Sequence, residues 1–115
     1  MKAWITSVAM LVVAFTPAYS KPKTASCDLM QKLAQQHADD MARRESLDHA
    51  GFETRAGRGA RAENVAMGHS SETKTLAQWR ASSRHAANMR LPGCKAIAYA
   101  VSRSGRFYWV MEIGK

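Results

Sequence analysis

Apolar residues recur every three or four positions between Asp28 and Glu45, which is the spacing of one face of an α-helix. The pattern predicts an amphipathic helix over this range with one side buried. His37 lies beside the apolar stripe, and we expect it at the edge of a core with its second ring nitrogen in solvent. The apolar positions are Leu29, Met30, Leu33, Ala34, Ala38, Met41 and Ala42.

Two further patterns follow in the second half of the chain. Serines at 70–71 and 82–83 precede short periodic stretches, and serine is a favoured N-cap, so two short helices are expected. Pro92 and Gly93 end the second of them.

Residues 96–102 and 106–113 are rich in aromatic and β-branched side chains and flank Ser104-Gly105, which predicts a hairpin. Its last strand would show Phe107, Trp109, Met111 and Ile113 on one face and Tyr108, Val110 and Glu112 on the other, which predicts layers on both sides of the sheet.

The N-terminal segment has the composition of an export signal. Lys2 precedes an apolar core from Val8 to Phe15, and Ala18-Tyr19-Ser20 offers a cleavage site. The apolar run is shorter than the roughly 20 residues that span a bilayer, so a membrane-spanning anchor is not expected. We therefore divide the chain into a signal peptide (1–20), a polar lead-in (21–27) and one compact domain (28–115), exported to the periplasm or the cell exterior.

The chain that follows the expected signal peptide is strongly basic. Residues 21–115 carry 16 Lys and Arg against 9 Asp and Glu, a net charge of +7. Such a balance favours lipid headgroups or other anionic envelope components over nucleic acid for an exported protein. Arg55, Arg58 and Arg61 lie in a Gly-rich stretch, 51–61, that shows no sustained period and is interpreted as a mobile basic loop. A solvated surface is its ordinary role, and an anion site is the alternative.

Cys27 and Cys94 are the two cysteines. A small exported domain meets oxidising surroundings and often needs a covalent link, so we expect them to form one disulfide. Two buried free thiols, or one exposed reactive thiol, are the alternatives. Neither cysteine lies in a C-x-x-C or histidine-rich context that would favour metal or redox chemistry.

Three polar residues in apolar surroundings are candidates for a site: His49, Glu63 and His85. Neutral imidazoles bind divalent metals, and a carboxylate completes such a site or orients a histidine. Their wide spacing is not a metal motif in itself, and Glu63 could equally accept backbone N–H bonds. Trp79 and Trp109 are interpreted as core aromatics. Ser82 and Ser83 fit helix N-caps better than a hydrolase nucleophile, since no G-x-S-x-G elbow is present.

The order of these residues resembles the bacterial branch of the CAP superfamily, which includes cysteine-rich secretory proteins, antigen 5 and pathogenesis-related proteins. The resemblance extends from Leu29 to Gly114 and implies a three-layer α/β/α sandwich with a small, mostly antiparallel sheet. It also implies that His49, Glu63 and His85 share a cleft and that a divalent ion binds the two histidines. Ala62 replaces the glycine of the Gly-Glu-Asn motif, and Ser82 stands where a second acid is usual. The residues that carry the resemblance are His49, Glu63-Asn64-Val65, Trp79, His85 and Tyr108-Trp109.

Three hypotheses about function follow. The first is a monomeric, exported binding module whose cleft takes a divalent metal such as Zn²⁺, a lipid or an envelope component. The second is a zinc-dependent hydrolase of envelope components, with His49 and His85 as ligands and Glu63 as general base. The third is a structural or interaction protein that presents the basic loop. Binding is favoured over catalysis, because catalytic zinc normally has three protein ligands.

Overall fold

The structure is a computed structural model that describes residues 25–115. The expected signal peptide, and residues 21–24 of the lead-in, lie outside the described residues. Helix α1 (Ala25–Arg44) begins three residues before the predicted start, so residues 25–27 of the lead-in belong to the helix. Within residues 25–115, none of the helices is long and apolar enough to cross a membrane.

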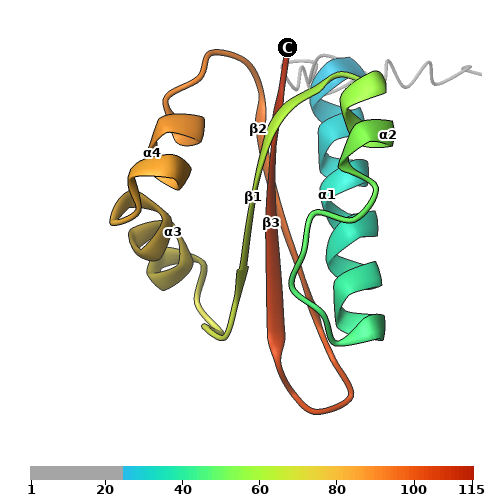
Figure 1. Ribbon diagram of the computed structural model, residues 1–115, viewed down its shortest axis with the longest axis vertical. Helices are drawn as coiled ribbons and strands as arrows, with labels where there is room; N and C mark the ends of the chain where they lie inside the picture. Colours follow the sequence, from blue (N-terminus) through green and yellow to red (C-terminus); the bar gives the residue numbers. More distant parts are fainter. Residues whose placement is uncertain (1–24) are drawn as a thin grey trace, which may run out of the picture.

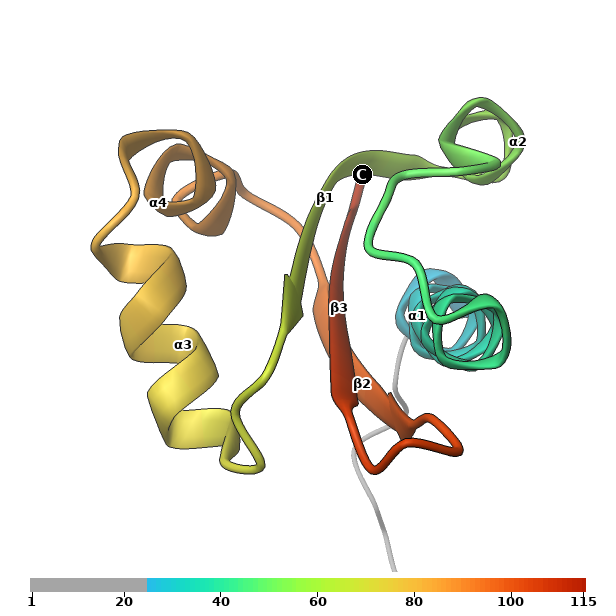
Figure 2. The ribbon, with the colours of Figure 1, turned by 60° about the horizontal axis from the view of Figure 1, so that its bottom comes forward.

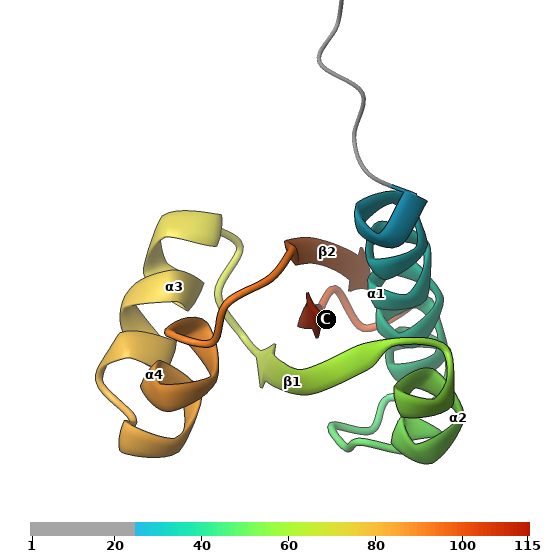
Figure 3. The same cartoon turned by 90° about the horizontal axis from the view of Figure 1, so that it is seen from above.

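The described chain forms three layers, with a sheet between two groups of helices (Figures 1 and 2). Helices α1 and α2 (Phe52–Gly57) lie on one side, and α3 (Glu72–Arg80) and α4 (Ser83–Met89) lie on the other. Figure 3 shows the same layers from above. The sheet has three antiparallel strands in the order β1-β3-β2, namely β1 (Ala60–Met67), β3 (Phe107–Gly114) and β2 (Lys95–Val101). The predicted α/β sandwich architecture is confirmed.

The alternation of side chains along β3 divides the core in two. Tyr108 and Val110 pack with the alanines of α1, whereas Trp109, Met111 and Ile113 pack with Trp79 on the α3/α4 side. This is the division that the sequence pattern predicts. The small side chains at 34, 38 and 42 are almost fully buried and leave room for α1 to lie close to the sheet.

Both short helices after residue 70 begin where the serines predict. The Ser71 hydroxyl accepts a hydrogen bond from the backbone N–H of Lys74, as an N-cap does. Ser82 is in the N-cap position of α4, but its hydroxyl makes no capping hydrogen bond. Trp79 is 1% exposed and its Nε1 donates to the carbonyl of Val65, so its interpretation as a core aromatic is confirmed.

The prediction of a mobile loop over 51–61 is wrong. Gly51 and Gly59 adopt positive φ values of 80° and 115° and bracket α2, and β1 begins at Ala60. Arg55 is buried (8% exposed), whereas Arg58 and Arg61 are exposed, so the three arginines do not form one basic surface loop. Arg55 is buried because acidic side chains lie beside it, a compensation that the local sequence pattern does not reveal.

The predicted disulfide joins Cys27, in the first turn of α1, to Cys94, just before β2, with a Cα–Cα distance of 5.4 Å. It connects the α1 layer to the start of the sheet. Gly93 is required beside it, because a Cβ there would lie 2.0 Å from the carbonyl oxygen of Gly114.

Two glutamines of α1 cover the free edge of β2. The side-chain amides of Gln31 and Gln35 donate to the backbone carbonyls of Ile97 and Tyr99, each at 2.9 Å. An unpaired strand edge is a template for association with another chain, so these contacts protect it. Tyr99 is 50% exposed next to this edge.

We expect the combined substitution of Gln31→Ala and Gln35→Ala to increase self-association, because it uncovers two strand carbonyls beside exposed apolar side chains. Sedimentation velocity over a concentration series should give a larger average mass for the double variant than for the wild type. Gln36→Ala is the matched control, since Gln36 is an exposed residue of the same helix. An unchanged profile of the double variant would show that the amides do not protect the edge.

Candidate functional site

His49 lies in the connection between α1 and α2, which is held in place through Asp48. The Asp48 carboxylate accepts two hydrogen bonds from Arg44, and its backbone carbonyl lies 2.8 Å from Nε2 of His37. The bonds from Arg44 hold the pKa of Asp48 well below its usual value. The side chain of His49 is half-exposed, and its Nδ1 lies 2.6 Å from Oε2 of Glu63.

Glu63 projects from β1 toward the α1 layer and is 1% exposed at its side chain. Arg55 donates from Nε to Oε1 at 2.7 Å and from Nη2 to Oε2 at 3.1 Å. Burial alone would raise the pKa of Glu63, but the neighbouring Glu112 and the hydrogen bonds with Arg55 and His49 lower it below its usual value. Both carboxylate oxygens are therefore engaged inside the protein.

His37 is a buried neighbour of this carboxylate rather than an edge residue. It is 3% exposed, and its Nε2 lies 3.8 Å from Oε2 of Glu63. The expectation of a ring nitrogen in solvent is wrong in this respect, because the α1–α2 connection covers the ring and offers the carbonyl of Asp48 as its partner.

A second acid, Glu112, lies directly opposite Glu63 in the β1–β3 register. It is fully buried, and its Oε1 is 3.3 Å from Nε of Arg55. Burial, together with the neighbouring carboxylate of Glu63, raises the pKa of Glu112 to about 10. Sequence reasoning did not include Glu112 or Arg55 in the site. A lone acid within the apolar run 107–113 was the available signal.

His85 approaches from the other side of the sheet, on α4. Its Nδ1 lies 3.0 Å from the hydroxyl of Ser82, and its backbone carbonyl accepts a hydrogen bond from the side chain of Asn64. Burial lowers the pKa of His85, and the positive charges of His49 and Arg84 lower it further. The charge of His49 therefore acts on His85 across edge strand β1.

The three candidate residues thus have different environments. Glu63 is buried behind His49 and contacts it directly, whereas His85 lies on the opposite face of β1, where Asn64 holds its backbone. Each histidine uses Nδ1 for an internal hydrogen bond, which leaves Nε2 for a ligand. Among residues 25–115, no group of three or more His, Cys, Asp or Glu side chains is arranged to hold a metal ion. The described residues therefore offer two imidazoles as candidate metal ligands, each with a hydrogen-bond partner at Nδ1, namely Glu63 for His49 and Ser82 for His85.

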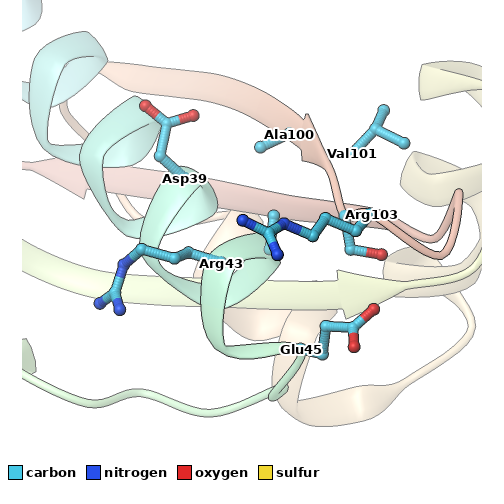
Figure 4. Close-up of a pocket in the computed structure, with 8 residues that line it drawn as sticks. Asp39, Arg43, Glu45, Ala100, Val101 and Arg103 are labelled. Carbon is cyan, nitrogen blue, oxygen red and sulfur yellow. The ribbon is translucent and has the colours of Figure 1, made fainter.

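Two grooves lie outside this pair of histidines. One, of about 330 Å³, runs between α1 and α2 and is lined in part by His37, Arg55 and Arg58. The other, of about 560 Å³, lies between α1 and the β2–β3 hairpin, with charges of both signs at its rim (Figure 4). The first groove reaches the residues that surround Glu63, whereas the second is lined by other residues, including Asp39, Arg43, Glu45, Ala100, Val101 and Arg103.

Comparison with known proteins gives one match. The model of a protein family described as CAP, the Cysteine-rich secretory protein family, matches residues 18–113. No curated protein and no solved structure matches the chain.

Proposed function

Because the chain belongs to the CAP family of cysteine-rich secretory proteins, we propose that it is a binding module that holds a divalent metal ion between His49 and His85. Zn²⁺ is the first candidate, since it binds neutral imidazole nitrogens. The observation that carries the proposal is the contact between Nδ1 of His49 and the buried carboxylate of Glu63. A metal-binding histidine commonly donates its other ring N–H to a carboxylate, which fixes the tautomer and leaves Nε2 as the ligand atom.

Ser82 supports His85 in a comparable way. Its hydroxyl lies 3.0 Å from Nδ1 of His85, and it makes no capping hydrogen bond to α4. A hydroxyl is a weaker partner than a carboxylate, so the two histidines are not equally well oriented. The lowered pKa of His85 favours the neutral imidazole that a metal requires.

Two protein ligands are few for zinc. Structural zinc sites have four and catalytic sites usually three. We therefore expect an exchangeable ion whose remaining positions are open to a ligand. Such a ligand would be an anionic lipid or another envelope component, in line with the positive charge of the chain.

The geometry supports binding rather than zinc-dependent hydrolysis. A general base must come within hydrogen-bond reach of the proton that it abstracts. Glu63 is buried, and both of its oxygens are held by Arg55 and His49, so it is available neither as the base nor as a third ligand.

The disulfide supports a location in an oxidising compartment. Such bonds persist in the periplasm and outside the cell and are rare in the cytosol. The Cys27–Cys94 bond and the family membership both fit an exported protein. The composition of residues 1–20 adds to this proposal.

Zinc titration by calorimetry on the oxidised protein tests the proposal. We expect binding in the micromolar range, weakened about tenfold or more by His49→Ala with His85→Ala, because both ligand nitrogens are then lost. His69→Ala is the matched control, since the exposed His69 touches Trp109 through its backbone carbonyl. Wild-type protein without measurable affinity, or equal affinity in the double variant, would contradict a two-histidine site.

A further inference from the structure

Glu63 and Glu112 form a buried pair of acids with a shared arginine. They are direct partners across β1 and β3, so their side chains lie on the same face of the sheet. Their side chains are 1% and 0% exposed. Two like charges directly opposite each other in a sheet repel, and water does not screen them here.

Among the described groups that face the two acids, one carries a permanent positive charge. Arg55 is the guanidinium that contacts both, at 2.7 Å from Glu63 and 3.3 Å from Glu112. The other titratable groups that face the pair are His37 from α1 and His49 from the α1–α2 connection. Both imidazoles face Glu63. Nε2 of His37 also lies within hydrogen-bond distance of the backbone carbonyl oxygen of Asp48.

Within the described residues, no group donates a hydrogen bond to the carboxyl group of Glu112, although that group is fully buried. An ionised carboxylate in such a place would be desolvated, without a hydrogen bond, and would share the single charge of Arg55 with Glu63, which is strongly unfavourable. A neutral carboxylic acid that donates to Glu63 removes these problems, and burial raises the pKa of Glu112 in agreement with this.

We propose that Glu112 is a positioning residue of the histidine site: it stays protonated in the folded protein and donates a hydrogen bond to Glu63. The role in the site rests on the proposed function, whereas the bound proton does not. Glu63 then remains an ionised carboxylate, fixed by Arg55, and keeps Nδ1 of His49 as its donor. Glu112 acts through Glu63 and contacts neither a metal nor a ligand.

The bound proton has a definite effect on stability. The folded pKa of Glu112 lies above its unfolded value of about 4.5, so unfolding between these values releases a proton. The stability that Glu112 contributes is fully present below its pKa in the unfolded chain. It falls as the pH rises toward the pKa of Glu112 in the folded protein. The folding equilibrium constant should therefore fall by up to about tenfold per pH unit between pH 7 and 9. Glu63 and His85 have lowered pKa values, so their titration changes stability below pH 7 and not between pH 7 and 9.

Two substitutions separate the proton from the hydrogen bond. Glu112→Gln keeps a donor for Glu63 at every pH but carries no titratable proton, and Glu112→Leu removes both. We expect urea unfolding between pH 7 and 9 to show the decline in stability in the wild type and a flatter profile in both variants. If the stability of the wild type depended on pH as little as that of Glu112→Gln, the proposal that folded Glu112 is protonated would be overturned, whether or not zinc binds.

The positioning role has its own measurements. Nitrogen chemical shifts of the His49 ring should show an Nδ1–H tautomer in the wild type and in Glu112→Gln, and a mixture of tautomers in Glu112→Leu. Zinc affinity at pH 7 should be kept by Glu112→Gln and weakened about tenfold by Glu112→Leu. Equal tautomer populations in folded Glu112→Leu and wild type would overturn the positioning role. Absence of zinc binding in all three proteins would instead count against the proposed function, and the ring shifts would still decide the role of Glu112.

Discussion

Replacing Arg55 by leucine is expected to lower the free energy of unfolding by about 3–5 kcal/mol, the usual cost of removing one partner of a buried ion pair. Glu63 would lose two hydrogen bonds and the guanidinium that contacts it, while Glu112 remains beside it. The same side chain also donates to the carbonyls of Ala50 and His49. The variant should therefore loosen the connection that carries His49 as well as the core.

Urea denaturation at pH 7 measures this loss. Arg58→Leu is the matched control, since it removes the same charge from an exposed position three residues away. A surface change of this kind should stay within about 0.5 kcal/mol of the wild type. Arg55→Leu combined with Glu63→Leu should recover part of the stability, because no unpaired charge then stays behind. Equal losses for Arg55→Leu and Arg58→Leu would show that Arg55 does not stabilise the buried acids.

Removal of the disulfide by Cys27→Ala with Cys94→Ala is expected to cost about 4 kcal/mol in the chain-entropy model, because the bond closes a long loop in the unfolded chain. The two cysteines are 67 residues apart. In a domain with so small a core, this is a large share of the 5–15 kcal/mol by which folded proteins are usually stable.

Thermal and urea unfolding of the double variant, with and without a reducing agent, measure this contribution. Reduction should destabilise the wild type by a similar amount and leave the alanine variant unchanged, which separates the bond from other effects of the reductant. A loss below about 1 kcal/mol would mean that the unfolded chain is already restricted by other contacts.

Elements with a regular local pattern were predictable from the sequence. The long stripe of α1, the serines before α3 and α4, and the alternation along β3 each depend on side chains a few residues apart. Strand β1 was not predicted, because Glu63 and Asn64 interrupt its apolar residues and four consecutive residues, 63–66, are buried. Its conformation depends on pairing with β3, more than forty positions later in the chain.

The site was only partly predictable for a related reason. Residue type identifies His49, Glu63 and His85 as candidates for chemistry, but it does not show on which side of a strand each one lies. Arg55 belongs to a residue type that is normally exposed, and its burial is explained only by the two acids beside it. The resemblance to CAP proteins supplied the grouping that the spacing alone did not.

The order of the strands has a consequence for biosynthesis. Both outer strands pair only with β3, and β3 follows every other described element along the chain. The ribosome therefore delivers α1, β1, both cysteines and β2 before the strand that joins them exists. The three-stranded sheet of the described residues therefore cannot form before this strand has emerged. Cys27 and Cys94 both precede β3 along the chain, so the sheet that holds them together is completed only after both have been synthesised.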